Sequence, residues 1–213
     1  MDKHLESILN KKVERTMDNL TKNNMAAIYV RSKDQVVEKV SEFMKEGELV
    51  AVGGSMTLIE TGVLNHLRSG RYSFLDRYME GLSRSQIDEI HRKAFFADTY
   101  LTSTNAITEN GELYNVDGNG NRVAAMIFGP KKVIVVAGIN KIVRNIDEAV
   151  ERVRRVAAPA NTTRLSCETP CIQTGYCVDC KKDRRICCAY TVLGHQMQKD
   201  RIKVILVGES LGY

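Results

Sequence analysis

The segment Leu49-Val50-Ala51-Val52-Gly53-Gly54-Ser55 carries the features that decide the fold. Its first part is an apolar run, which is typical of a strand buried on both faces of a sheet. The two glycines permit a tight turn, and Ser55 can accept a hydrogen bond from the first backbone N–H groups of a following helix. Because similar apolar runs alternate with helical patterns along the chain, the segment predicts an α/β fold.

Further strands and helices follow at the spacing of βαβ units. The apolar run Lys132–Ala137 is the strongest strand signal. Asn110-Gly111 lies between two short apolar runs and predicts an antiparallel hairpin. We therefore predict a doubly wound, mostly parallel α/β sheet with one antiparallel hairpin. Other strands are expected at residues 26–30, 72–75, 100–102 and 201–207, and helices at residues 4–23, 32–47, 55–67, 83–96, 122–127 and 145–159.

Length and composition indicate one globular domain. The chain has 213 residues, of which 43% are hydrophobic and 27% charged, so it can bury a core without disulfides. We expect a single domain over residues 1–213, in which residues 160–190 form a cysteine-rich segment. No apolar run is long enough to span a bilayer, and the charged N-terminal residues do not resemble a secretory signal. These features favour a cytoplasmic protein, and a homo-oligomer is possible.

The charge pattern argues against nucleic acid as a partner. The 31 Lys and Arg residues are mixed with 26 Asp and Glu residues, which leaves a net charge of only +5. The densest basic run, Lys181–Arg185, lies inside the cysteine-rich segment. There it is better explained as a solvated loop, or as compensation for bound thiolates, than as a phosphate-binding stripe.

The turn at Gly53-Gly54-Ser55 is a candidate site for an anion. Glycines allow close approach of a ligand to the backbone, and the hydroxyl groups of Ser55 and Thr57 can donate hydrogen bonds to it. In open α/β sheets, ligands bind at the carboxyl ends of strands. The alternative is an ordinary tight turn in which Ser55 only caps a helix, because the sequence matches neither a Walker loop nor GxGxxG.

The hairpin around Glu109 is a second candidate site. A carboxylate held at a turn beside a strand end can act as a nucleophile or general base, so Glu109 is our candidate catalytic residue. Its neighbourhood is rich in groups that could bind a ligand: Asn105, Asn110, Gly111 and Asn121. A surface hairpin with a charged tip is the alternative interpretation.

All six cysteines fall between Cys167 and Cys188, in the pattern C-x3-C-x5-C-x2-C-x6-C-C. In a cytosolic chain such a cluster is typical of metal ligands rather than structural disulfides. The expected ligands are Cys167, Cys171, Cys177, Cys180 and Cys187. Cys187 and Cys188 are adjacent, so on a strand their side chains would point in opposite directions and at most one would join the site.

The identity of the metal is not fixed by this spacing. An iron–sulfur cluster of the 4Fe–4S type is our preferred cofactor, and zinc is the alternative. A closed site of four thiolates supports structure or electron transfer, because it leaves no open coordination position. Unliganded thiols, or a redox-active pair, would explain the pattern without a metal.

Three stretches together resemble the LUD-domain family, which includes lactate-utilisation protein C. They are Val52–Leu58, Ala97–Leu113 and Gly118–Ala124, and the similarity continues through Lys132–Asn140 to about Pro159. The resemblance implies a fold like that of ribose-5-phosphate isomerase and the CoA transferases. Thr108-Glu109-Asn110-Gly111 is also similar to the Ser-Glu-Asn-Gly stretch of class I CoA transferases, whose Glu is the nucleophile, although Thr replaces Ser here.

The resemblance implies a role in the utilisation of L-lactate or a related 2-hydroxy acid, with iron–sulfur proteins as redox partners. In that case the glycine turn would bind a small anionic or phosphate-bearing ligand, and the cysteine cluster would hold a metal or iron–sulfur centre. One alternative is an isomerase or CoA-transferase-type enzyme that uses Glu109. Another is a zinc-stabilised binding module without catalysis.

Overall fold

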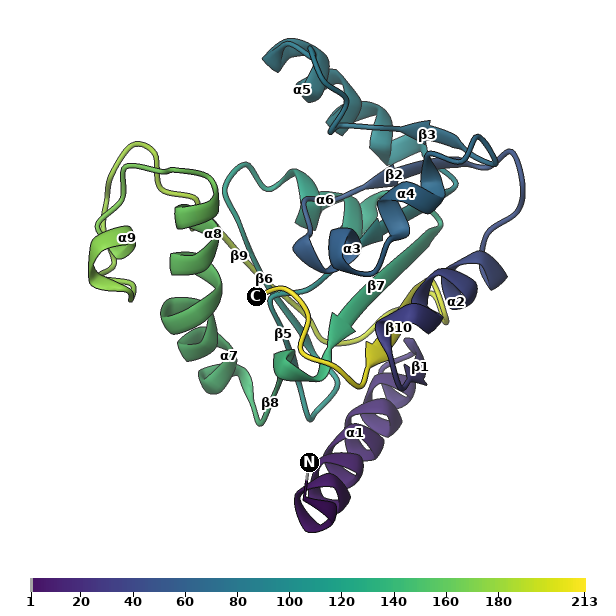
Figure 1. Cartoon of the computed structure of the whole chain (residues 1–213), viewed down its shortest axis with the longest axis vertical. Coiled ribbons are helices and arrows are strands. Elements are labelled where there is room, and N and C mark those ends of the chain that lie inside the picture. Colours follow the sequence, from purple (N-terminus) through teal and green to yellow (C-terminus); the bar gives the residue numbers. More distant parts are fainter. Residues whose placement is uncertain (1) are drawn as a thin grey trace.

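The central element of the fold is a six-stranded sheet in which all neighbouring strands are parallel (Figure 1). The structure is a computed structural model that describes residues 2–213. The strand order is β1-β10-β7-β4-β2-β3. Their bounds are β1 Ala26–Val30, β2 Leu49–Val52, β3 Ser73–Leu75, β4 Thr99–Thr102, β7 Lys132–Gly138 and β10 Ile202–Val207. The expected mostly parallel sheet is confirmed.

Alternate residues of the central strand β7 enter two different cores. Val133 and Val135 contribute to one core, which α1, α6 and the hairpin strands cover. Ile134 and Val136 contribute to the other, which α2, α3 and α4 cover. Both faces of the sheet are therefore buried, which explains why its strands are continuous apolar runs.

The helices connect the strands, and short 3₁₀ turns extend several of them. The helices are α1 Lys3–Lys22, α2 Val36–Glu42, α3 Met56–Glu60, α4 Val63–Leu67, α5 Arg84–Lys93, α6 Asn121–Phe128, α7 Ile146–Arg152, α8 Ala158–Arg164 and α9 Cys171–Thr174. The 3₁₀ turns are Lys33–Gln35, Ala94–Phe96 and Ile139–Lys141.

The predicted hairpin lies in a second sheet and not at the edge of the first. This sheet has the order β8-β5-β6-β9, with β8 at Ile142–Val143, β5 at Ala106–Thr108, β6 at Leu113–Asp117 and β9 at Ala189–Leu193. β5 and β6 form the expected antiparallel pair around Asn110-Gly111. Strand β9, which the sequence did not predict, pairs with β6 and ties the cysteine-rich segment to the sheet.

Two predicted helices differ from those in the structure. The expected helix at residues 55–67 is broken into α3 and α4 at Gly62, which adopts a left-handed φ of 73°. The expected end of a helix near Pro159 was also wrong, because the chain continues through a π-helical turn, Val153–Ala157, into α8. Proline lacks an N–H group, and at the first turn of α8 that group needs no acceptor in the same helix.

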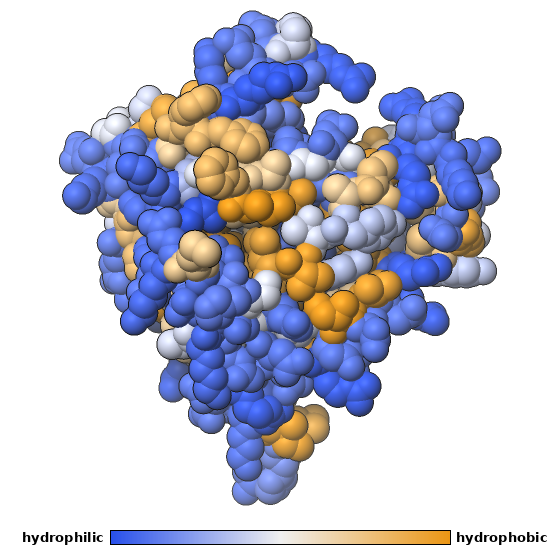
Figure 2. Space-filling view, turned by 180° about the vertical axis from the view of Figure 1, so that it is seen from behind, coloured by the Kyte–Doolittle hydropathy of each residue, from blue (hydrophilic) through white to orange (hydrophobic). Residues whose placement is uncertain are grey.

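Helix α1 extends beyond the rest of the molecule at its N-terminal end (Figure 1). Val13 and Leu20 pack into the core, whereas Leu5 and Ile8 are 59% and 65% exposed. The apolar residues of the helix are therefore buried or half-buried from Val13 onward, whereas Leu5 and Ile8 in its first turns are exposed. The face seen in Figure 2 also gathers apolar side chains near its middle, surrounded by hydrophilic ones. Within residues 2–213, no helix has the length and apolar character needed to cross a membrane.

Candidate functional site

A polar cleft of about 420 Å³ lies where strands of the main sheet end. It is formed by the segments that follow the carboxyl ends of β2, β4 and β7, by the β6–α6 loop, by α8, and by the C-terminal residue Tyr213. Ligands of parallel α/β sheets bind at this edge. Of the residues predicted to bind a ligand, Gly54, Asn105 and Asn121 line this cleft.

The two glycines of the turn have different roles. A Cβ atom at Gly53 would lie 2.8 Å from Thr102 Oγ1 and 3.0 Å from Tyr100 Oη, so this glycine allows β2 and β4 to pack closely. A Cβ atom at Gly54 would meet nothing nearer than Arg77 Nη1 at 3.7 Å. Gly54 therefore borders open space in the cleft, whereas Gly53 is required for packing.

Ser55 and Thr57 also differ from one another. The Ser55 hydroxyl accepts a hydrogen bond from the backbone N–H of Leu58 at 3.2 Å, and its own N–H donates to Tyr78 Oη. These contacts match the alternative interpretation of Ser55 as an ordinary helix cap. Thr57 instead accepts a hydrogen bond at Oγ1 from Lys141 Nζ at 3.1 Å, so it forms part of the polar site.

Lys141 is the most unusual side chain at the cleft. It is 2% exposed and lies in the 3₁₀ turn that follows β7. Its Nζ atom donates to Ser103 Oγ at 2.9 Å and to Thr57 Oγ1, and none of the ion pairs within residues 2–213 includes it. A buried ammonium without a carboxylate partner is unfavourable.

The surroundings of Lys141 favour the neutral amine. Burial, followed by the positive charges of Arg152 and Arg122, lowers the pKa of Lys141 to about 7, and Glu60 opposes this shift only in part. An amine with such a pKa is substantially unprotonated at neutral pH and has a lone pair available for proton transfer or attack on a carbonyl carbon.

Arg122 also lines the cleft and, like Lys141, contacts Ser103. Its guanidinium group pairs with Asp117, with Nη2 and Oδ1 2.7 Å apart, and both side chains are at most 10% exposed. It also donates to the Ser103 carbonyl oxygen at 2.9 Å and to Asn105 Oδ1 at 3.0 Å. Asn105 therefore lies at the site as predicted, with its side-chain oxygen held by Arg122.

The remaining charges at the cleft are mainly positive. Arg77, Arg164 and Arg185 line it, against the carboxylates of Asp117 and Asp183. Asp117 is already paired with Arg122. Within the described part of the chain, neither Arg77 nor Arg164 forms an ion pair with a carboxylate. The cleft therefore presents guanidinium groups that can bind a small anion.

The hairpin tip lies against α1 and does not line the cleft. Glu109 pairs with Arg15 of α1 at 2.6 Å, and Asn23 donates to the carbonyl oxygens of Asn110 and Gly111. Gly111 has a φ of 80°, and a Cβ atom there would lie 2.5 Å from the Asn19 backbone. These contacts hold α1 against the hairpin, and the catalytic role of Glu109 stays a prediction.

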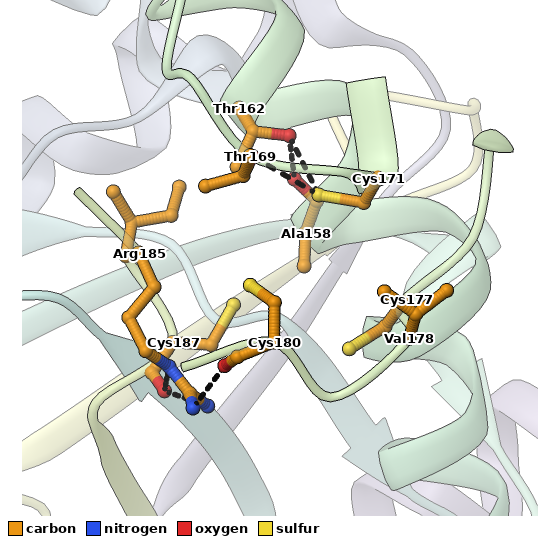
Figure 3. A pocket seen from close by; sticks show the side chains of 10 residues that line it. Ala158, Thr162, Thr169, Cys171, Cys177, Val178, Cys180, Arg185 and Cys187 are labelled. Atoms are coloured by element: carbon orange, nitrogen blue, oxygen red, sulfur yellow. Dashed lines mark hydrogen bonds between the residues drawn. The ribbon is translucent and has the colours of Figure 1, made fainter. Parts of the chain in front are cut away.

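Four of the five expected metal ligands line a second, small cavity of about 20 Å³. They are Cys171, Cys177, Cys180 and Cys187, and their sulfur atoms face a common space in Figure 3. Thr162 and Thr169 place their hydroxyl groups 3.2 and 3.3 Å from Cys171 Sγ. Cys167 is buried but lies outside this cavity.

The thiols are near one another without forming a closed site. Burial raises the pKa of the Cys187 thiol to about 11, and Cys177, Cys171 and Cys180 add to this shift. Among residues 2–213, no three His, Cys, Asp or Glu side chains are already arranged to hold a metal ion. Cys188 is exposed and lines the polar cleft instead, so the two adjacent cysteines face different cavities as expected.

The cysteine cavity and the polar cleft are neighbours. Arg185 and Ile186 line both of them. The Arg185 guanidinium donates to the carbonyl oxygens of Cys180 and Cys187, which holds the two ends of the intervening loop together. Only this part of the chain therefore separates the thiols from the cleft. Oxidation of the thiols, or metal binding by them, would take place directly beside the cleft.

Several residues at the cleft were not predicted from the sequence: Arg77, Ser103, Arg122, Lys141 and Arg164. Ser103 and Lys141 follow β4 and β7, so a search for polar residues at the ends of all predicted strands would have found them. The role of Arg122 has no comparable local signal, because it depends on how α6 packs against β6.

The fold and the cleft define an α/β protein with a polar cleft at the carboxyl edge of a parallel sheet. The model of the LUD domain family matches residues 13–207, and the chain belongs to this family. That match includes the cysteine-rich segment. Among proteins with curated descriptions, none matches the chain.

One solved structure shows a similar fold. A DUF162 family protein from Deinococcus radiodurans is similar with a TM-score of 0.55 and 17% identity, over 93% of this chain and 98% of that chain. At this identity the similarity concerns the fold alone. The eIF2B-beta2-delta2 complex from Chaetomium thermophilum gives a TM-score of 0.43 and 14% identity, over 84% of this chain and 56% of that chain.

Proposed function

We propose that this LUD-domain protein binds a small organic anion of the 2-hydroxy-acid or 2-oxo-acid class in the polar cleft, as part of lactate utilisation. The observation that carries the proposal is the convergence of Arg77, Arg164 and Lys141 on one cleft, without a carboxylate partner for any of them in the described chain. Guanidinium groups bind carboxylates in a bidentate geometry. Membership of the LUD family provides the link to lactate.

A buried polar atom in the same cleft also supports the binding of a ligand there. The hydroxyl group of Tyr213 is buried and has no hydrogen-bond acceptor among residues 2–213, since the Arg164 guanidinium beside it can only donate. Tyr213 lines the cleft, and the preceding residues are fixed by Asn140, whose side chain accepts from the Leu211 N–H and donates to the Gly212 carbonyl oxygen. A carboxylate in the cleft would give this hydroxyl group an acceptor.

Calorimetric titration of the full chain with L-lactate, pyruvate and inorganic phosphate tests this function. We expect one saturable site for a carboxylate, and binding at least about tenfold weaker in Arg77→Gln/Arg164→Gln, since each charge-assisted contact contributes about 1.5–3 kcal/mol. Arg155→Gln is the matched control, because Arg155 forms an exposed pair with Glu151. Unchanged affinity in the double variant, or no binding of any of the three anions, would contradict the proposal.

We further propose that Cys171, Cys177, Cys180 and Cys187 hold a metal centre, either a 4Fe–4S cluster or zinc. Their shared cavity and the chemistry of four thiolate donors support this assignment. A cluster would supply an electron-carrying group beside the cleft, whereas zinc would stabilise the loop between Cys177 and Cys187.

Metal analysis of anaerobically purified protein, together with a visible spectrum, tests this assignment. We expect metal in the native chain and in Cys188→Ser, and its loss in Cys180→Ser. Iron with sulfide would support a role with iron–sulfur redox partners, and zinc would support a structural role. Metal-free protein that was kept reduced throughout would refute the assignment.

A further inference from the structure

We propose that Lys141 is a nucleophilic amine that condenses with the carbonyl group of a small 2-oxo acid held in the cleft. The inference rests on the proposed anion-binding function and deepens it, because it names the reacting atom and requires a carbonyl group in the ligand.

The first argument is the environment of the amine. Lys141 Nζ is held by two hydroxyl groups, those of Ser103 at 2.9 Å and Thr57 at 3.1 Å. The charged groups that face it are Arg122 of α6, Arg152 of α7 and Glu60 of α3. Two of these three charges are positive, so the surroundings disfavour a proton on the amine. A lysine made nucleophilic by burial and neighbouring cations is an established route to imine formation.

The second argument is position. Lys141 lines the cleft although the residue as a whole is 2% exposed. A neutral amine has four tetrahedral directions: three N–H or C–N bonds and one lone pair. The two hydroxyl contacts occupy only two of these directions. Arg77 and Arg164 line the same cleft, where they can hold the carboxylate of the ligand. The amine and the carboxylate site thus lie on one cavity, as a 2-oxo acid requires.

The chemistry balances without a further reagent. The nitrogen lone pair attacks the carbonyl carbon, and the C–O π electrons move to oxygen. A proton passes from nitrogen to this oxygen, for which the Ser103 hydroxyl is placed as the relay, and a carbinolamine results. The nitrogen lone pair then forms the C=N bond while the C–O bond breaks, and the hydroxyl group leaves as water with the remaining N–H proton, which gives an imine between Nζ and the former carbonyl carbon. Ser103 is therefore a positioning and proton-transfer residue, and Lys141 is the group that bonds to the ligand.

Trapping with borohydride tests the proposal on the full chain. Pyruvate is the probe, and borohydride reduces an imine to a stable secondary amine that peptide mass mapping locates. We expect one adduct at Lys141 and none there in Lys141→Met. Lys132→Met is the matched control, because Lys132 lies at the other end of β7 and pairs with Glu48, so this variant should be trapped like the native chain.

Two further readouts separate a reactive amine from a structural lysine. We expect trapping to become half-maximal near neutral pH, because the amine is already unprotonated there, and to slow by at least about tenfold in Ser103→Ala, in which the proton relay is lost. Trapping that rises only at the pH of ordinary lysines, or that spreads evenly over surface lysines, would overturn the proposal.

The same samples distinguish failure of this inference from failure of the proposed function. Calorimetric binding of pyruvate without an adduct at Lys141 would overturn the condensation and leave anion binding intact. An adduct from the uncharged probe propionaldehyde, without saturable binding of any anion, would support the reactive amine and overturn the anion site. Absence of both binding and adducts would refute both.

Discussion

The Nζ atom of Lys141 lies 2.9 Å from the Oγ atom of Ser103, and both residues are buried. Ser103 follows β4 and Lys141 follows β7, two neighbouring strands of the parallel sheet. The second hydroxyl partner, Thr57, belongs to the helix after β2. The amine thus contacts residues that follow two other strands of the sheet, β4 and β2. Its protonation should affect the stability of the fold and the reaction proposed for it.

The stability of the fold should depend on pH through Lys141. The folded state lowers the pKa of this amine from 10.5 to about 7, so between these values the unfolded chain binds more protons. The free energy of unfolding must therefore rise with pH from about 7 towards 10.5, by up to about 1.4 kcal/mol per pH unit. Below pH 7 the buried amine is protonated, and the full cost of burying its charge lowers the stability. Urea unfolding at pH 7, 8 and 9 measures the slope. Lys141→Met should lack this contribution, and an equal slope in both proteins would contradict the assignment.

Removal of the Arg122 side chain should be among the most damaging single changes. Arg122→Met leaves the Asp117 carboxylate buried without its partner, and also removes donors to Ser103 and Asn105. We expect a loss of about 3–5 kcal/mol in the free energy of unfolding. Arg155→Met, which breaks an exposed pair, should cost less than about 1 kcal/mol. Comparable losses in the two variants would show that the buried contacts of Arg122 stabilise the fold no more than an exposed ion pair does.

The two glycines of the turn should respond differently to alanine. Gly53→Ala places a methyl group 2.8 Å from Thr102 Oγ1 and should destabilise the fold by about 1–3 kcal/mol. Gly54→Ala meets only Arg77 Nη1 at 3.7 Å and Tyr78 Oη at 3.9 Å, both ordinary contact distances, so its fold should be retained. Thermal unfolding of the two variants checks this difference. A greater loss of stability from Gly54→Ala would reverse our assignment of packing to Gly53.

Replacement of Glu109 should have a small effect if the carboxylate serves only to hold α1. Glu109→Gln weakens its contact with Arg15, whose side chain is 58% exposed. We expect a loss of about 0.2–1 kcal/mol and unchanged binding of carboxylates in the cleft. Arg15→Gln is the matched control, since it breaks the same pair from the other side. A changed reaction of a bound ligand in Glu109→Gln, but not in Arg15→Gln, would support the CoA-transferase-type mechanism.

Removal of a metal from the cysteine site should loosen one segment and spare the sheet. Chelation is expected to raise hydrogen exchange at residues 171–188, because the thiolates would be the main constraint on that loop. Amides of β7 and β10 should keep their protection, since these strands are paired on both sides within the sheet. Exchange that is identical before and after chelation would argue against a metal in this loop.

Much of the fold was determined by local sequence patterns. The run Lys132–Ala137 predicted its strand because a strand buried on both faces has no alternative to continuous apolar residues. Asn110-Gly111 predicted its hairpin because Gly111 needs a left-handed φ. The helix break at Gly62 and the passage through Pro159 were not predicted, because a glycine within a helical pattern can also continue the helix, whereas a proline more often ends one.

Only the tertiary structure decided which polar residues share a site. The sequence indicated that ligands bind where strands end, which pointed to the turn at Gly54, and it named Asn105 and Asn121 as polar neighbours of the Glu109 hairpin; all three residues line the cleft. It did not reveal that Glu109 points to α1, or that Ser103 and Lys141 meet, because such contacts join segments far apart in the chain. The spacing of the cysteines suggested one cluster, but the fold placed Cys187 in the small cavity and Cys188 in the cleft, because residues adjacent in an extended chain face opposite sides.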